Sequence, residues 1–452
     1  MQRLRSLYAG RPVVVGPGIL AGYTGTVSFL RGLGCDVLVL STEQGAGAIP
    51  RIDECVVVDI EVPRAESVTE ELRALDHLAH HLPDDVVAAV EEFDPDRRAL
   101  WHASHFVTDD EPILGRRVVN GRPAAFMALE DKLLAEEIWA AAGVPTAPYE
   151  IVPVDTEAFA AATGRLASPM GAVWSGDARD GFNGGGNYVR WVADEGDAAA
   201  AVEFFRARCD RVRVMPFLDG VPCSIHGIVL PDGTAVFRPV EIATVRDVPG
   251  RRFVYGGLST YWDPTPADRE AMRDAARSVG EHLQSAYGYR GAFGIDGVMT
   301  SDGFRPTELN SRVSAGLTTA SAVARDLFGL VQTHLVLGLD TGLTVADLES
   351  LVPAMDAERV GKPIAVVEGV KVGRPHELIV GYDGERLTRV KLGHGDVLAL
   401  ADTPTGFFAK IDRCAALVPG ERLGPLNTAL LAFLTREYDA GVPPVEAAPD
   451  LR

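Results

Sequence analysis

The sequence contains no apolar run of about 18 residues, the length that a membrane-spanning helix needs. A secretion signal would place a hydrophobic segment near the N-terminus, but Arg3 and Arg5 interrupt that stretch. We therefore expect a soluble cytoplasmic protein that does not interact with membranes.

Cysteine is also rare. The five cysteines are scattered, and no two have the Cys-x-x-Cys spacing of a zinc site or redox motif. This pattern argues against a disulfide framework and favours a reducing compartment. Acidic residues outnumber basic ones by 63 to 43, and the resulting net charge of −20 repels nucleic acids at long range. We expect no nucleic-acid partner.

Two kinds of functional motif are missing. No Ser-His-Asp or Cys-His arrangement indicates a protein nucleophile, and no Gly-x-Gly-x-x-Gly sequence indicates a dinucleotide site. The segment Gly16-Pro17-Gly18 follows the apolar stretch 11–15, and we interpret it as a tight connection from a strand to a helix. With a helix expected at 22–34 and strands at 36–40 and 56–60, the N-terminal part is predicted to be a doubly wound α/β domain.

The most informative polar cluster is Glu308-Leu-Asn310-Ser-Arg312, which follows an apolar stretch that contains Asp296. Two strands joined by a turn at 301–303 would bring these four side chains to one strand end. Because alternate residues of a strand point to the same face, Glu308, Asn310 and Arg312 are expected to share a face. Two carboxylates and an amide oxygen suit Mg²⁺ bound to a polyphosphate. The alternative is an edge strand with a solvated polar face.

Lys132 lies near the start of residues 128–142, whose apolar side chains recur at helical spacing before Gly143 and Pro145. Lysine is scarce in this arginine-rich chain, so a lysine at a helix start indicates a phosphate contact. The alternative is a surface partner of Glu136, one helical turn away.

A glycine-rich loop, Gly184-Gly185-Gly186, lies between apolar strands expected near 172–175 and 188–192. The exposed backbone N–H groups of such a loop suit a lid that closes over a triphosphate. The alternative is an Asn-Gly hairpin that binds no ligand.

Taken in order, Lys132, the glycine-rich loop, Asp296 and the Glu-x-Asn-x-Arg element resemble the ATP-grasp carboxylate-amine ligases over about residues 120–345. The resemblance implies an α/β N-terminal domain of the preATP-grasp (Rossmann-like) kind, an α+β ATP-grasp fold in two subdomains, and a small β-rich C-terminal region with a terminal helix. A chain of 452 residues has room for two to four domains. The expected domains are 1–122, 123–214 (lid), 215–345 (catalytic) and 346–452. Within this superfamily the chain is most similar to peptide ligases of the pheganomycin type.

The resemblance also implies roles for the matching residues. Lys132 is expected to contact the phosphates of ATP, and Gly184, Gly185 and Gly186 are expected to form the lid. The expected adenine contacts are Met215, Phe217 and Leu218. The expected Mg²⁺ ligands are Asp296, Glu308 and Asn310. Lys132 and Arg312 are the expected catalytic residues, and Arg312 would stabilise charge that develops on the transferred phosphoryl group or on the tetrahedral intermediate.

The chain departs from the family pattern near the nucleotide. A second phosphate-binding lysine is usual after the strand that precedes the lid, but Trp174 and Ser175 occupy that place. Trp174 would stack on adenine instead. The missing positive charge would come from Arg179, Arg190 or Arg213, and the sequence leaves these three open.

The substrate site is less clearly marked. An antiparallel meander expected from 212 to 242 leads into a basic aromatic loop, residues 243–257. The candidate substrate contacts are Arg246 and Arg252 as clamps for a carboxylate, Tyr255, and Glu241 for an amine or a metal. The alternative is a solvated surface loop.

The implied reaction follows from the weak electrophilicity of a carboxylate. ATP would phosphorylate it, and an amine would attack the acylphosphate, with ADP and phosphate as products. The expected partners are a small-molecule carboxylate and an amine or peptide acceptor in secondary-metabolite biosynthesis, and such ligases often pair as homodimers. Two alternatives stay open: an acceptor that is not an amino acid, and a degenerate nucleotide-binding protein without turnover.

Overall fold

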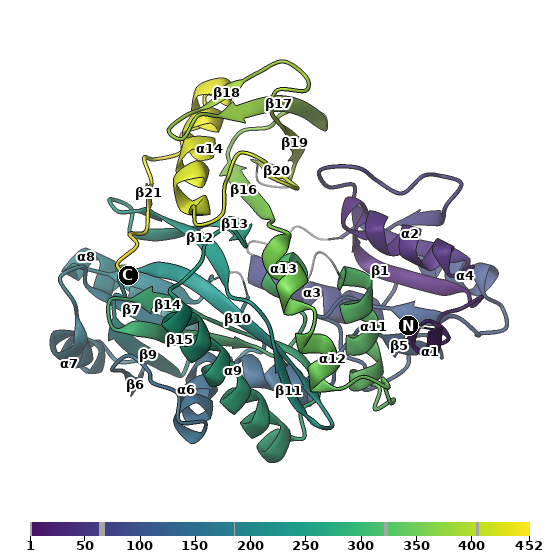
Figure 1. Cartoon of the computed structure of the whole chain (residues 1–452), viewed down its shortest axis with the longest axis horizontal. Coiled ribbons are helices and arrows are strands. Elements are labelled where there is room, and N and C mark those ends of the chain that lie inside the picture. Colours follow the sequence, from purple (N-terminus) through teal and green to yellow (C-terminus); the bar gives the residue numbers. More distant parts are fainter. Residues whose placement is uncertain (1, 63–67, 185, 321–323, 404–405) are drawn as a thin grey trace.

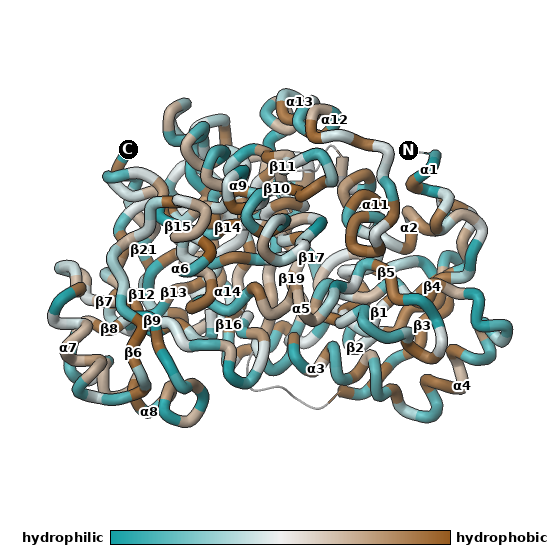
Figure 2. The backbone as a smooth tube through the Cα atoms, turned by 90° about the horizontal axis from the view of Figure 1, so that it is seen from below, coloured by the Kyte–Doolittle hydropathy of each residue, from teal (hydrophilic) through white to brown (hydrophobic). Residues whose placement is uncertain are grey.

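The computed structural model describes residues 2–62, 68–184, 186–320, 324–403 and 406–452 and contains three β-sheets with helices packed on them (Figure 1). Hydrophobic residues concentrate on the strands, and hydrophilic residues lie at peripheral turns and helix ends (Figure 2). Within the described ranges, every helix is too short or too polar to cross a membrane.

The N-terminal domain is built on a parallel sheet with the strand order β3-β2-β1-β4-β5. Its elements are α1 (Gln2–Arg5), β1 (Val13–Ile19), η1 (Leu20–Tyr23), α2 (Thr24–Gly32), β2 (Val37–Glu43), β3 (Val56–Asp59), α3 (Val68–His80), α4 (Asp84–Phe93), β4 (Leu100–His102) and β5 (Arg117–Val119). Val13 and Val15 face one apolar core and Val14 faces another, because successive side chains of a strand point to opposite faces. Both faces are thus covered, which confirms the predicted doubly wound α/β domain.

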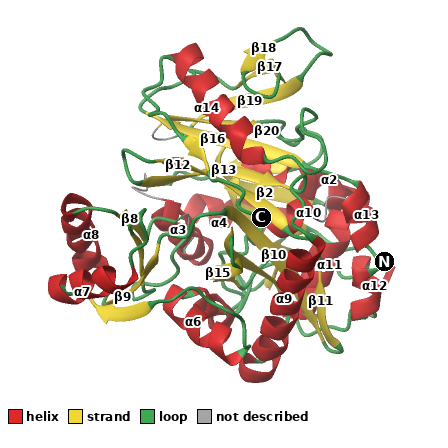
Figure 3. Cartoon of the chain, turned by 60° about the vertical axis from the view of Figure 1, so that its left-hand side comes forward, coloured by secondary structure: helices red, strands yellow, loops and turns green. Residues whose placement is uncertain are grey.

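The second sheet is antiparallel, with the order β6-β9-β7-β8, and lies in the predicted lid subdomain. The elements from the connection onward are α5 (Ala124–Met127), η2 (Ala128–Glu130), α6 (Lys132–Ala141), β6 (Glu150–Pro153), α7 (Thr156–Leu166), β7 (Ala172–Gly176), β8 (Val189–Val192), α8 (Glu195–Arg208) and β9 (Arg211–Pro216). Helices α7 and α8 lie on the outer side of this sheet (Figure 3). Strand β9 belongs wholly to this second sheet, so it is not part of the expected meander.

The third and largest sheet has the order β15-β14-β10-β12-β13-β16-β20-β19-β17-β18, with β11 and β21 paired at its side. Its first half includes β10 (Val221–Leu230), β11 (Gly233–Val236), β12 (Val240–Asp247), β13 (Arg252–Ser259), α9 (Pro266–Tyr287), β14 (Gly291–Thr300), β15 (Gly303–Asn310), α10 (Ala315–Ala320) and α11 (Arg325–Val336). Helix α9 begins at the Thr265 cap, whose hydroxyl accepts from the Asp268 N–H at 3.2 Å, and ends at Gly288 with φ +60°. The expected loop at 243–257 is instead the hairpin of β12 and β13.

The C-terminal strands continue the same sheet, because β16 pairs with β13. The remaining elements are α12 (Val345–Glu349), α13 (Val352–Ala357), β16 (Gly361–Glu368), β17 (His376–Tyr382), β18 (Leu387–Arg389), β19 (Asp396–Asp402), β20 (Gly406–Ile411), α14 (Leu423–Tyr438) and β21 (Glu446–Ala447). Helix α14 packs against β16 and covers the apolar face of these strands (Figure 3). The predicted β-rich C-terminal region with a terminal helix is therefore present, but its strands extend the third sheet.

Candidate active site

Two neighbouring strands bring the predicted metal ligands together. In the register of β14 and β15, Asp296 lies opposite Glu308, and Gly294 lies opposite Asn310. The Asn310 Nδ2 donates a 3.0 Å hydrogen bond to Asp296 Oδ2. Burial, and after it the charge of Glu308, raises the pKa of Asp296 to about 6. The site therefore concentrates negative charge that a cation would stabilise.

Lys132 lies beside these carboxylates because helix α6 packs against β15. The Asp131 side chain caps the helix by accepting hydrogen bonds from two backbone N–H groups of its first turn. Lys132 Nζ lies 2.6 Å from Glu308 Oε1, and the lysine side chain is only 4% exposed. The alternative of a surface pair with Glu136 is wrong, because Glu136 is buried and pairs with Arg213.

Arg312 is held from two directions. Its Nη2 donates to Asn310 Oδ1 at 2.8 Å, and its Nη1 forms an ion pair with Glu130. Glu130 is buried and pairs also with Arg122, which follows strand β5. Burial raises the pKa of Glu130, but the two guanidinium charges outweigh burial and hold it below its ordinary value. No role for Glu130 or Arg122 was predicted from the sequence, where the only signal was that Glu130 stands two residues before Lys132.

Two aromatic rings cover the guanidinium of Arg312. Its central carbon lies 4.9 Å from the ring centre of Phe106 and 5.3 Å from that of Phe182. Phe106 belongs to the N-terminal domain, and Phe182 belongs to the loop that follows β7. Cation–π attraction and exclusion of water therefore act on Arg312 from two other parts of the chain.

A Ser-His pair lies behind Asp296. Ser224 of β10 is opposite Asp296 in the register and hydrogen-bonds to it, and Ser224 Oγ lies 3.0 Å from His226 Nε2. His226 is fully buried, and burial lowers its pKa to about 3. A Cβ at Gly316 would lie 2.4 Å from the His226 ring, so glycine there makes room for the imidazole. The only sequence signal for Ser224 was that it is a polar residue within the apolar strand expected at this place.

The glycine-rich loop lies against helix α3 of the N-terminal domain. Gly184 is buried and Gly186 is exposed with φ +71°, while Gly185 lies outside the described residues. The Arg73 Nε of α3 donates to the Phe182 carbonyl oxygen at 2.7 Å. The N-terminal domain therefore helps to position the predicted lid loop.

The prediction that Trp174 stacks on adenine is wrong. Its ring is 1% exposed, its centre lies 4.5 Å from that of Phe159, and its Nε1 donates to Thr163 Oγ1 at 3.0 Å. These contacts place the indole in the core between the lid sheet and α7. The next residue, Ser175, points to the opposite face of the sheet and lies opposite Arg213 in the register.

Of the three arginines considered as substitutes for the missing lysine, Arg213 lies nearest the carboxylate cluster. Its Nη2 donates to the Thr307 carbonyl, one residue before the motif glutamate, at 3.0 Å, and its Nη1 lies 2.5 Å from Glu136. Arg179 pairs with the carboxylate of its sequence neighbour, and Arg190 stacks on an aromatic ring of α8.

The predicted adenine contacts lie at the end of strand β9, which contains Met215, and directly after it. Met215 and Phe217 are buried, and Leu218 is partly buried. The Phe217 ring centre lies 4.6 Å from that of Trp191 in β8 and 5.8 Å from that of Phe253 in β13. An apolar aromatic cluster therefore joins the lid to the β12–β13 hairpin at this place.

The predicted substrate contacts on the hairpin do not form one cluster. Arg246 Nη1 lies 2.6 Å from Asp219, and Arg252 Nη2 lies 2.8 Å from Asp247. Both guanidinium groups thus already have carboxylate partners in the chain. The Tyr255 side chain is 46% exposed, and desolvation, followed by the charge of Asp296, raises the pKa of its hydroxyl.

The prediction that Glu241 binds an amine or a metal is wrong. Its side chain is fully buried and accepts from Arg422 Nε at 2.7 Å and from the backbone N–H groups of Leu423 and Gly424 at 2.6 and 3.2 Å. These are the first backbone donors of α14, which otherwise would lack partners. Glu241 therefore fixes the start of the terminal helix.

Comparison with known proteins supports the architecture alone. No protein-family model matches the chain, and no curated protein matches it by sequence. Among solved structures it is similar to an N5-carboxyaminoimidazole ribonucleotide synthetase in an ADP complex, with 13% identity, a TM-score of 0.51, and coverage of 95% of this chain and 98% of the other. The carboxyaminoimidazole ribonucleotide synthase of Aspergillus clavatus with ATP has 12% identity, a TM-score of 0.53, and coverage of 95% and 99%.

A biotin carboxylase from Campylobacter jejuni, crystallised as a β,γ-ATP complex, has 11% identity, a TM-score of 0.55, and coverage of 99% and 95%. The similarity extends over nearly the whole of each of these chains. At such low identity it establishes a shared fold: an α/β N-terminal domain, an ATP-grasp fold in two subdomains, and a C-terminal region.

Proposed function

We propose that the chain is an ATP-dependent carboxylate-amine ligase that uses Mg²⁺ and releases ADP and phosphate. One observation carries the proposal: Lys132, Glu308, Asp296, Asn310 and Arg312 converge on one end of the β14–β15 pair. The similar structures include complexes with ADP and ATP, which supports a nucleotide as the phosphoryl donor.

The donor set of Asp296, Glu308 and Asn310 fits Mg²⁺ in its chemistry, since all three offer hard oxygen atoms. The raised pKa of Asp296 is consistent with negative charge that lacks compensation. Asn310 directs its amide NH₂ at Asp296, so its oxygen would have to turn toward a bound ion. When bound, Mg²⁺ would neutralise charge on the phosphate oxygens.

The protein side chains would orient and stabilise the reacting groups. Lys132, which now pairs with Glu308, would turn its ammonium to a phosphate once a cation neutralises the carboxylate. Arg312, fixed by Glu130, would stabilise charge that develops on the transferred phosphoryl group. Phe106 and Phe182 would keep water from an acylphosphate intermediate.

The test is to incubate the chain with ATP, Mg²⁺ and pairs of carboxylates and amines, and to measure phosphate release. We expect ADP and phosphate, whereas AMP and pyrophosphate would contradict an acylphosphate route. Glu308→Gln should reduce turnover about 100-fold. Glu137→Gln is the matched control, because Glu137 is exposed on the outer side of α6 and touches none of the site residues.

We also propose that the product is a peptide or amide of secondary metabolism. The sequence Asp180-Gly-Phe-Asn-Gly-Gly-Gly186 and its resemblance to peptide ligases support this choice. Mass spectrometry of products formed from amino acids, guanidino acids and short peptides would identify the acceptor. Products formed only with acceptors other than amino acids would favour a different ATP-grasp reaction.

A nucleotide-binding protein without turnover is the second candidate, and one observation favours it. Ser175 supplies no positive charge at the place of the usual second lysine, and Arg213 is already paired with Glu136. Calorimetry separates the two cases. Tight ATP binding without phosphate release for any substrate pool, and equal behaviour of Glu308→Gln and the wild type, would support this candidate.

We further propose a homodimer that forms through the N-terminal domain. The edge strand β3 exposes Val56 by 54% and Val57 by 38%, and Ile52 just before it is 97% exposed. Exposed apolar side chains on a sheet edge favour pairing with a second chain. Sedimentation of the wild type should indicate a dimer that Val57→Lys dissociates, and a monomeric wild type would contradict the proposal.

A further inference from the structure

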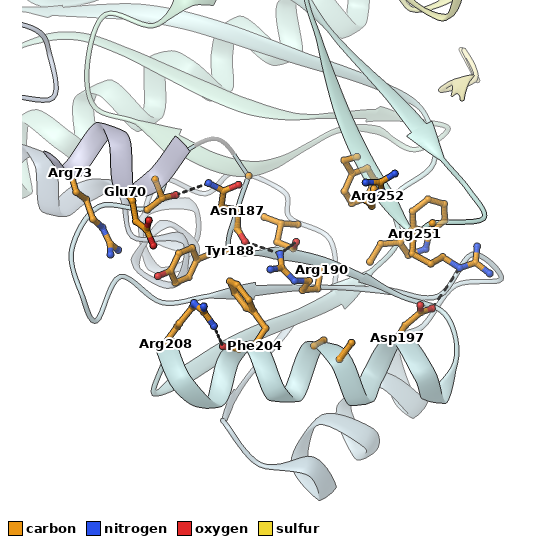
Figure 4. A pocket seen from close by; sticks show the side chains of 18 residues that line it. Glu70, Arg73, Asn187, Tyr188, Arg190, Asp197, Phe204, Arg208, Arg251 and Arg252 are labelled. Carbon is orange, nitrogen blue, oxygen red and sulfur yellow. Dashed lines mark hydrogen bonds and ion pairs between the residues drawn. The ribbon is translucent and has the colours of Figure 1, made fainter. Parts of the chain in front are cut away.

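A pocket of about 600 Å³ lies apart from the carboxylate cluster, around the free edge of strand β8. Helix α3, strand β8, helix α8 and the turn between β12 and β13 form its walls (Figure 4). The N-terminal domain, the lid and the catalytic sheet thus all contribute to it. Of the residues that the sequence predicted to act at the nucleotide or substrate site, Gly186, Arg190 and Arg252 line this pocket.

The pocket has a strong positive charge in an acidic protein. Its lining includes five arginines and two carboxylates, whereas the whole chain has a net charge of −20. Arg251 pairs with Asp197, and Arg252 pairs with Asp247 outside the lining, so the uncompensated positive charge belongs to the other three arginines. The arginines are Arg73, Arg190, Arg208, Arg251 and Arg252, and the carboxylates are Glu70 and Asp197. Such a local field attracts anions even when the net charge repels them.

Two of these arginines lie on one phenyl ring. The guanidinium carbons of Arg190 and Arg208 are 3.6 and 4.5 Å from the centre of Phe204. Their protein hydrogen bonds go to backbone carbonyl groups, and within the described part of the chain neither has a carboxylate partner. Burial, and then the charge of Arg208, lowers the pKa of Arg190. Two like charges thus share one phenyl ring, and among the described residues no carboxylate neutralises either of them.

The fully buried arginines of this chain, in contrast, all form ion pairs with carboxylates. They are Arg116, Arg122, Arg213 and Arg238. Arg73, across the pocket, donates to the carbonyls of Gly181 and Phe182, and its Nη1 makes no hydrogen bond with the residues that the structure describes. N–H groups of three arginines therefore remain available to a ligand.

We propose that this pocket binds a small molecule through an oxyanion group, a phosphate or a carboxylate, with Arg190 and Arg208 as the clamp and Arg73 as a third contact. Planar guanidinium groups match the oxygen atoms of such groups in bidentate fashion. The bound anion supplies the negative partner that neither guanidinium group has among the described residues. This binding site goes beyond the proposed ligase reaction and does not depend on it.

The test is calorimetric titration of the full chain with inorganic pyrophosphate and, separately, with citrate, in metal-free Tris buffer at low ionic strength. We expect saturable binding of at least one probe. Binding of pyrophosphate alone assigns a phosphate ligand, and binding of citrate alone assigns a carboxylate ligand. No saturable binding of either probe at millimolar concentration would overturn the proposal.

Three variants locate the binding. Arg190→Met and Arg208→Met should each weaken binding of the probe at least tenfold, because each removes one side of the clamp. Arg206→Met is the matched control: it removes the same charge from an exposed position on α8 and should change the dissociation constant less than twofold. Equal losses in all three variants would overturn the proposal, since they would indicate long-range attraction only.

A fourth variant separates this site from the proposed nucleotide site. Lys132→Met removes the positive charge of the carboxylate cluster and should leave probe binding unchanged, whatever it does to phosphate release. Loss of probe binding in Lys132→Met would overturn the proposal and place the anion at the nucleotide site instead. Thermal unfolding of each variant checks the fold, and Arg208 is exposed, so Arg208→Met retains a test if Arg190→Met does not fold.

Discussion

Glu130 should be the most sensitive residue of the candidate active site to loss of charge. Its carboxylate is only 2% exposed and pairs with both Arg122 and Arg312. Glu130→Gln keeps the size of the side chain and one acceptor oxygen, but it removes the charge that both guanidinium groups face. Arg122 has the same 2% exposure and would retain a positive charge that water cannot reach. Removal of one partner from such a buried pair costs about 3–5 kcal/mol.

Urea unfolding followed by tryptophan fluorescence measures this cost. Trp139 of α6 is fully buried and reports on the core next to Glu130. With a slope of about 3 kcal/mol per molar urea, the unfolding midpoint of Glu130→Gln should fall by about 1–1.7 M. Turnover should fall as well, because Arg312 loses the group that fixes its guanidinium beside Asn310.

Two comparison variants make the reasoning refutable. Arg312→Gln leaves Glu130 paired with Arg122, and Arg312 is 14% exposed, so its cost should be smaller, about 1–2 kcal/mol. Glu137→Gln, on the exposed side of α6, should change stability by less than about 0.5 kcal/mol. A midpoint for Glu130→Gln within about 0.2 M of the wild type, or a larger loss in Arg312→Gln, would refute the buried-charge argument.

Three further predictions concern other parts of the structure. Trp174→Ala should destabilise the lid by about 3–5 kcal/mol because it empties a packed core site; a stability change below about 1 kcal/mol in urea unfolding would contradict that packing. Glu241→Gln should cost about 2–3 kcal/mol, since it removes the charge that Arg422 and the start of α14 face, and hydrogen exchange should increase first in α14. The pKa of Asp296 is about 6, above its ordinary value of 3.8. Protonation of this carboxyl therefore stabilises the metal-free folded chain. The stabilisation is complete below about pH 3.8 and is lost as the pH rises through 6. Unfolding free energies between pH 4 and 7 should therefore fall by at most about 3 kcal/mol in the wild type and remain flatter in Asp296→Asn.

The sequence predicted local elements well where side-chain periodicity and turn residues agree. The strands around Asp296 and Glu308, with a turn at 301–303, occur as β14 and β15. The helix at Lys132 occurs as α6, although it begins later than expected because Asp131 caps it. The prediction of a loop at 243–257, which was based on its charged residues, was wrong. Cross-strand pairing of β12 and β13 forms a hairpin there.

Face assignment on single strands was less certain. Trp174 and Ser175 are neighbours in β7, and only the packing of α7 decides which of them points into the lid core. Likewise, an isolated glutamate such as Glu241 has the same local signature whether it binds a ligand or caps a helix. Its partner in sequence, Arg422, lies far away and only the fold brings them together.

The sequence alone determined the order of the motifs, the α/β start of the chain and the composition of the carboxylate cluster. These features depend on residue type, on the period of two along a strand, and on the period of 3.6 along a helix. The tertiary structure decided which charged side chains lie together. Lys132 pairs with Glu308, Glu130 pairs with two arginines, and Arg190 and Arg208 lie over one phenyl ring. Such pairings join residues that are distant in the chain or on separate elements, so they depend on packing of whole elements, which no local pattern encodes.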